Sequence, residues 1–137
     1  KWQDVSVGIF AVSENWLSDA GLSPNSSVAD KHAKWEDEVQ AARHWAKTLR
    51  EQGAELVLCL CHDNMPEMRR LVKEVEEVDF FLGGHEHVYA SGDRFVIAGY
   101  DFDDYCLLSF DVPADGSRPR PPKQERVQVP GNELLPE

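Results

Sequence analysis

The chain has little positive charge and no long apolar run. Its 137 residues include 14 Lys or Arg against 25 Asp or Glu, which gives a formal net charge of -11. Binding to DNA or RNA needs a clustered basic surface, so this balance argues against a nucleic acid polymer as partner. It leaves room for a small phosphorylated substrate, because bound cations can supply positive charge locally. No apolar run approaches the ~20 residues that span a bilayer, so no membrane span is expected.

Cysteine is scarce too, and several catalytic motifs are missing. Only three cysteines occur, and Cys59 and Cys61 alternate within one strand-like run. Two positions on one face of a strand favour reduced core residues over a disulfide, which favours an intracellular location. The sequence contains no nucleophilic Ser or Cys arrangement, no phosphate-cradling glycine loop and no dinucleotide fingerprint. The common hydrolase and nucleotide-binding motifs therefore do not explain this chain.

What the sequence does have is histidine at the ends of two apolar runs. The Gly-Gly-His-Glu-His stretch at residues 83–87 directly follows the apolar run 78–82, and the run 55–61 ends on His62. Paired glycines let a backbone turn sharply and approach a ligand closely. Neutral imidazole is the commonest protein ligand for divalent transition metals. His62, His85 and His87 are therefore predicted to form a metal site, serving one cation or divided between two.

The order of apolar and polar runs predicts an α/β layered domain. An amphipathic helix is expected over residues 30–52, and a second one begins at Asn64, which precedes Glu67 by three positions. Strands separated by helices favour parallel pairing, whereas the last two expected strands could form a hairpin across residues 101–104. The expected strands cover residues 5–12, 55–61, 78–82, 94–99 and 105–112. Ligands of open α/β sheets gather beyond the carboxyl ends of the strands, where the three histidines fall.

Two parts are expected along the chain. Residues 1–112 carry all the expected helices and strands, whereas residues 113–137 contain six of the eight prolines mixed with charged residues. Such a composition predicts an extended or disordered tail, or a linker. The start on Lys1, close before a strand, leads us to expect a piece of a longer polypeptide.

Other polar residues have ordinary structural explanations. Asp63 and Asn64 follow His62 and could orient its imidazole, although Asn64 would serve equally well as a helix cap. Cys61 is expected to face the core. The acidic turn at residues 101–104 lacks the glycine and ligand spacing of a calcium loop, so a solvated turn is expected. His32 and His44 are expected on the polar side of the first helix.

At this point the chain resembles a known family. Its segments 7–17, 49–57, 78–87 and 99–102, with His62 between the second and third, resemble the second half of the calcineurin-like metallophosphoesterase domain, specifically the 5'-nucleotidase-type branch. The resemblance implies a four-layer α-β-β-α sandwich with mixed sheets, of which this chain would be one part. The N-terminal half of the same domain would be its partner, carrying the bridging carboxylate and the acid/base histidine.

The resemblance also implies a chemistry. His62 and His85 would bind one divalent metal ion and His87 a second, with Gly83 and Gly84 beside the substrate pocket. The pair of ions, Mn²⁺, Zn²⁺ or Fe, would activate a hydroxide that attacks the phosphorus of a phosphomonoester, and a nucleotide is the expected substrate. The chain alone would then be inactive, and its own catalytic residues unknown.

Some positions depart from the family pattern. Cys61 stands where many relatives have Thr, Met68 replaces a common Asp, and Tyr100 replaces a Ser or Thr. These changes keep the expected ligands and put the usual substrate preference in doubt. Three alternatives therefore stay open: a phosphodiesterase or phosphoprotein phosphatase of the same fold, a non-catalytic binding module, and a hydrolase with one metal held by three histidines.

Overall fold

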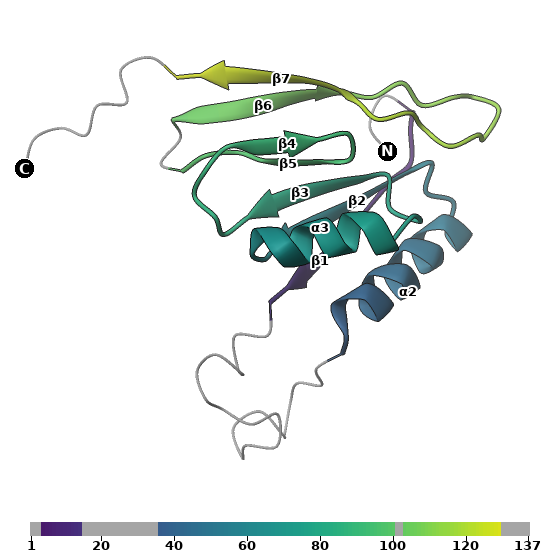
Figure 1. Cartoon of the computed structure of the whole chain (residues 1–137). Coiled ribbons are helices and arrows are strands. Elements are labelled where there is room, and N and C mark those ends of the chain that lie inside the picture. The colour runs from purple at the N-terminus through teal and green to yellow at the C-terminus, as the bar shows by residue number, and fades with distance from the viewer. Residues whose placement is uncertain (1–3, 15–35, 101–102, 130–137) are drawn as a thin grey trace, which may run out of the picture.

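The computed structural model describes residues 4–14, 36–100 and 103–129. Within them, five strands form a mixed sheet in the order β1-β2-β3-β5-β4, and two more strands form a separate antiparallel pair (Figure 1). The strands are β1 Val7–Ser13, β2 Leu56–His62, β3 Phe80–Gly84, β4 Ala90–Gly92, β5 Phe95–Ile97, β6 Asp104–Ser109 and β7 Lys123–Gln128. The helices are α2 Glu38–Glu51 and α3 Met65–Glu74. The predicted α/β class is confirmed.

The sheet is mostly parallel, as the strand–helix alternation predicted. β1, β2, β3 and β5 run parallel, and only β4 is antiparallel, to β5. Both helices lie on the same face of the sheet (Figure 1). The core between them contains the apolar side of each element, including Val57, Cys59 and Phe81. The carboxyl ends of β1, β2 and β3 therefore lie side by side at one edge.

Helix α2 begins later than the sequence suggested. Residues 30–35 lie outside the described part, and Asp37 is not helical because its side chain caps the helix, accepting the Gln40 N–H at 3.1 Å. Val39, Ala42 and Ala46 are buried on the face toward the sheet. The helix ends before Gly53, whose φ of 91° lies in the left-handed region that glycine adopts without strain.

Helix α3 begins where predicted. The Asn64 side chain accepts the Glu67 N–H at 3.1 Å, which satisfies a free amide of the first turn. Met68 and Leu71 are fully buried against the sheet. A Cβ at Gly83 would come within 2.3 Å of Met68 Cε and 2.6 Å of Ile97 Cγ1. Gly83 is thus required for close packing between β3 and its covering side chains.

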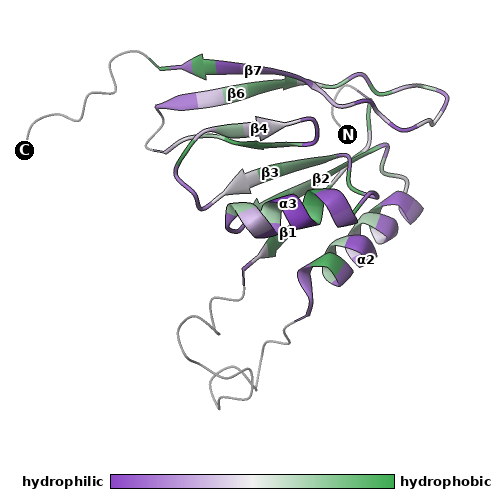
Figure 2. Ribbon diagram, in the orientation of Figure 1, coloured by the Kyte–Doolittle hydropathy of each residue, from purple (hydrophilic) through white to green (hydrophobic). Residues whose placement is uncertain are grey.

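The end of the chain differs from the prediction in two ways. β5 pairs with β4 instead of forming a hairpin with β6, and the partner of β6 is β7. Residues 123–128, expected in an extended or disordered tail, are therefore a hydrogen-bonded strand. This strand was not predicted because β7 is largely hydrophilic (Figure 2) and follows a proline-rich segment. In the described part of the chain, no helix is long and apolar enough to cross a membrane.

Candidate metal site

Strand register brings three potential ligands to one edge of the sheet. Ser13 pairs with His62, and His62 pairs with Gly84, so the residues that end or follow β1, β2 and β3 are neighbours. The Glu14 N–H donates to the His62 carbonyl at 3.1 Å, which extends the β1–β2 ladder by one bond. Glu14, His62 and His85 thus come from three adjacent strand ends.

The side chains of these three residues converge. One potential ligand atom from each of Glu14, His62 and His85 lies within 4.8 Å of the other two. The imidazoles of His62 and His85 meet edge to face, with centroids 5.3 Å apart at 90°. Glu14 Oε1 lies 3.4 Å from His85 Nδ1. Both imidazoles are solvent-exposed, so an ion and a substrate have access.

The loop after β3 has an unusual backbone. His85 has a φ of 84° and His87 a φ of 52°, both in the left-handed region that side chains with a Cβ rarely adopt. Such conformations cost on the order of 1–3 kcal/mol each and gather at functional sites. At Gly84 an added Cβ would lie 3.3 Å from His62 Nδ1. The glycine therefore leaves room for the imidazole of His62.

His87 is placed apart from the three-residue group. Its ring stacks on Tyr100, with centroids 6.0 Å apart and planes 20° from parallel. In the described ranges the ligand atoms that converge come from Glu14, His62 and His85, and His87 is not among them. The geometry thus unites two of the three predicted imidazoles and supports one cation position.

Asp63 and Asn64 have partners of their own. Asn64 caps α3, and its N–H donates to Asp63 Oδ1 at 2.8 Å. Asp63 is buried, at 1% exposed, on the helix-covered side of the sheet. Its Oδ2 accepts no hydrogen bond as long as the nearby carboxyl groups are ionised. Burial, a hydrogen bond to Asp63 and repulsion from Asp63 raise the pKa of Glu38 from 4.5 to about 8. A proton on Glu38 supplies the missing donor.

Cys61 and His44 lie where the sequence predicted, in the core and on the exposed side of α2. Cys59, Cys61 and Cys106 are free thiols. Burial is the main cause that raises the pKa of Cys61, so its thiol stays protonated and faces the core. His44 is exposed on α2. The prediction for His32, and the acidic-turn position Asp101, lie outside the described residues.

Two residues of this edge were missed from sequence. Glu14 carries no motif, and only the register of β1 against β2 reveals it. Glu86 lies between the two predicted ligands, yet its Oε1 accepts the Met65 N–H at 2.6 Å. That bond ties the loop after β3 to the first turn of α3, where a carboxylate also complements the helix dipole.

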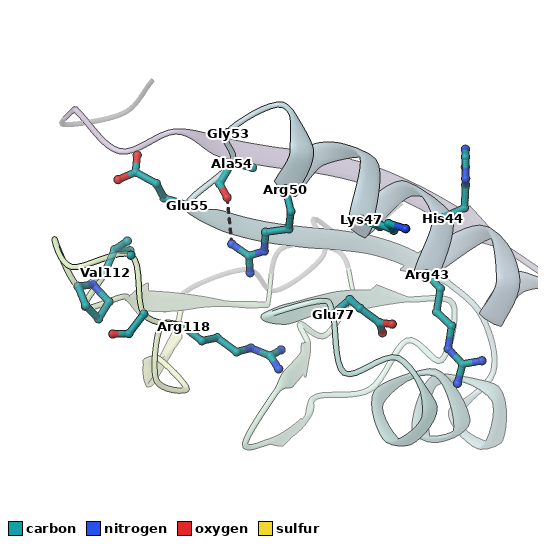
Figure 3. Close-up of a pocket in the computed structure, with 13 residues that line it drawn as sticks. Arg43, His44, Lys47, Arg50, Gly53, Ala54, Glu55, Glu77, Val112 and Arg118 are labelled. Atoms are coloured by element: carbon teal, nitrogen blue, oxygen red, sulfur yellow. Dashed lines mark hydrogen bonds between the residues drawn. The ribbon is translucent and has the colours of Figure 1, made fainter.

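A pocket of about 710 Å³ lies at the opposite edge of the sheet (Figure 3). Figure 3 shows Arg43, Lys47 and Arg50 projecting from α2, with Arg118 on a separate segment. Each cation has a partner within the chain. Arg50 and Arg118 bind Asp79, Arg43 donates to the Glu74 carbonyl and Lys47 pairs with Glu51. The pocket therefore has no free basic cluster, and it lies at the opposite edge of the sheet from His62, His85 and His87.

Comparison with known proteins gives partial similarity to nucleotidases. The chain is 28% identical over 67 residues to a 5'-nucleotidase of Diplobatis ommata, covering 49% of this chain and 12% of that protein. It is 26% identical over 99 residues to an NAD 5'-nucleotidase of Haemophilus influenzae, covering 69% of this chain and 16% of that protein. No family model matches the sequence. The chain thus corresponds to less than a fifth of either relative.

Proposed function

We propose that this chain is part of a metal-dependent phosphoric ester hydrolase of the 5'-nucleotidase type. The observation that carries the proposal is the convergence of Glu14, His62 and His85 at the carboxyl ends of three adjacent strands. Ligands of α/β sheets bind at this edge. The partial similarity to two nucleotidases favours a nucleotide phosphomonoester as substrate.

The donor set of this edge fits a divalent transition metal. Two imidazoles and one carboxylate suit Zn²⁺, Mn²⁺ and Fe, whereas Mg²⁺ and Ca²⁺ prefer oxygen ligands alone. A bound cation polarises a phosphoryl oxygen and lowers the pKa of water beside it. Glu14, His62 and His85 would hold the cation at an edge that is open to solvent. Gly84 has no side chain, so it would not obstruct a substrate that approaches the cation. The cation also offsets the acidic composition where a phosphate would bind.

The rest of the site is assigned to a further part of the same domain. Both helices cover one sheet face, whereas Ile9 and Leu60 on the other face are 56% and 44% exposed. These side chains share a face because Ile9 pairs with Leu58, two positions before Leu60. An N-terminal half packed there would complete the four-layer sandwich. It would also supply the bridging carboxylate, and His87 would then turn to a second ion.

The proposal is tested on the full-length polypeptide that contains these residues. Hydrolysis of AMP and of p-nitrophenyl phosphate is measured with added Mn²⁺ for the unaltered protein, for His85→Ala and for His44→Ala. Loss of a metal ligand is expected to lower turnover by at least about 100-fold, because its effect exceeds the 10–100-fold typical of outer-sphere groups. His44→Ala, which removes an exposed imidazole from α2, is expected to keep full activity.

The outcome separates an enzyme from a binding module. Turnover that depends on Mn²⁺ and on His85 supports the proposal. Equal turnover in the unaltered protein and His85→Ala, or no hydrolysis by any of the three, contradicts it.

A further inference from the structure

We propose that Glu14 is the third protein ligand of the metal ion, so that this chain by itself holds one divalent cation through one carboxylate and two imidazoles. This inference rests on the proposed function only for the identity of the two histidines. It assigns a role to a residue that the histidine motif does not include.

The backbone places Glu14 where a ligand is needed. β1 and β2 are paired over their whole length, and the bond from the Glu14 N–H to the His62 carbonyl fixes the next residue beyond the strand. On the other side of β2, the pairing of His62 with Gly84 fixes the position before His85. His62 ends β2 within the sheet, Glu14 is held by one hydrogen bond just beyond β1, and His85 is the first residue after β3. Such support is what a metal site requires.

The separation between Glu14 and His85 favours a metal over a direct hydrogen bond. Glu14 Oε1 and His85 Nδ1 are 3.4 Å apart, longer than the ~2.7–3.2 Å of a typical N–H···O bond. Two ligand atoms that each lie about 2.0–2.1 Å from a tetrahedral Zn²⁺ are separated by roughly 3.4 Å. A ligand atom of His62 lies within 4.8 Å of those of Glu14 and His85, and the two imidazoles are exposed.

The charge of Glu14 and its contacts also support its assignment as a metal ligand. Within the described ranges, His85 is the ion-pair partner of Glu14, whose side chain is only 22% exposed. A divalent cation among the three side chains would neutralise this carboxylate and would provide a reason for the left-handed backbone of His85. Three protein ligands also leave a coordination position for substrate or water, as in catalytic zinc sites.

The competing role for Glu14 is to orient His85 without touching the metal. The two roles differ in what happens when residue 14 becomes a thiol. A thiolate bound to Co²⁺ gives a sulfur-to-metal charge-transfer band in the near ultraviolet, whereas an outer-sphere thiol does not. The protein's own Cys59 and Cys61 are buried in the core, so the unaltered chain provides the baseline.

The test uses the 137-residue chain, with folding checked by circular dichroism. Co²⁺ is added to the unaltered protein, to Glu14→Cys and to Ser91→Cys, which places a thiol at an exposed position of β4 outside the cluster. Zn²⁺ affinity is measured in parallel by calorimetry for the unaltered protein, Glu14→Gln and Glu86→Gln. Glu86→Gln removes the same charge beside His85 from a side chain that is bound to α3.

The expected result is one ion per chain, a charge-transfer band in Glu14→Cys alone, and Zn²⁺ affinity at least about 10-fold weaker in Glu14→Gln than in Glu86→Gln. A folded Glu14→Cys without the band, or a Glu14→Gln that binds as tightly as the unaltered protein, overturns the inference. Neither the charge-transfer band nor the Zn²⁺ affinity depends on hydrolysis. A full-length polypeptide without hydrolytic activity would contradict the proposed function and leave the role of Glu14 standing. Absence of the charge-transfer band in Glu14→Cys would overturn the role of Glu14 and leave the proposed function standing.

Discussion

The charged side chains at the two edges of the sheet are paired in different ways. At the amino ends of β2 and β3, the side chain of Asp79 is 2% exposed and receives bonds from Arg50, from Arg118 and from the Val57 N–H. At the carboxyl ends, ligand atoms of Glu14 and two imidazoles lie within 4.8 Å of one another, with Glu14 Oε1 3.4 Å from His85 Nδ1. The first edge is a completed ion-pair network, and the second is a cluster of residues that could hold a metal ion.

The backbone gives a weaker contrast, because both edges contain left-handed residues that are not glycine. At the amino ends, Gly53 follows α2 in this conformation, and so does Asp4 just before β1. At the other edge His85 and His87 adopt left-handed conformations without being glycine. Strain is retained where the surrounding structure and a function require it. The comparison teaches that the amino-end edge has its charges paired within the chain, whereas the carboxyl-end edge gathers side chains that could serve as ligands.

The largest expected effect comes from breaking the completed edge. Asp79→Ala leaves two guanidinium groups without their shared carboxylate and removes an acceptor from the Val57 N–H. The free energy of unfolding should fall by about 3 kcal/mol, the low end for breaking a buried ion pair, because both guanidiniums keep contact with water. Urea denaturation measures it, with Glu51→Gln on the surface of α2 as control. A loss no greater than that of the control would show that the network is not stabilising.

A smaller effect is expected from the carboxyl pair of Glu38 and Asp63, next to the proposed metal site. The pKa of Glu38 is raised to about 8, so between pH 4.5 and 8 the folded chain holds a proton that the unfolded chain has lost. The free energy of unfolding should therefore decrease as pH rises through this range, and the contribution is fully present only below about pH 4.5. Glu38→Gln should flatten the profile, since its amide donates to Asp63 at every pH. Denaturation at a series of pH values checks this, and an unchanged slope in Glu38→Gln would contradict it.

How much the sequence predicted depends on whether a feature is local. The cap at Asn64 and the stop at Gly53 are set by neighbouring residues, and both were predicted. The proximity of His62 and His85 was expected because both come at the ends of apolar runs whose alternation with helices favoured parallel pairing, and the register of His62 with Gly84 brings them together. The two helix ends need no knowledge of register.

The features that were missed depend on distant pairing. Glu14 joins the cluster only because β1 aligns Ser13 with His62, and nothing in a single sequence fixes that alignment. His87 was predicted as a ligand together with the other two histidines. Its ring stacks on Tyr100 in this structure, and its role as a ligand stays a prediction. β7 is hydrophilic and follows prolines, so its pairing with β6 overrides its local composition.

The most direct test of the account is His85→Gly, which should raise stability without metal and weaken metal binding. His85→Gly removes a side chain that disfavours the observed φ of 84°. Without metal, the free energy of unfolding of the variant should therefore be about 1 kcal/mol higher than that of the unaltered chain. With Zn²⁺ at about 100 times its dissociation constant, the unaltered chain should gain about 2.7 kcal/mol and the variant far less, so the order of stability reverses. Urea denaturation with and without Zn²⁺ measures both values. The same Zn²⁺-dependent gain in the two proteins would contradict a metal site at this edge of the sheet.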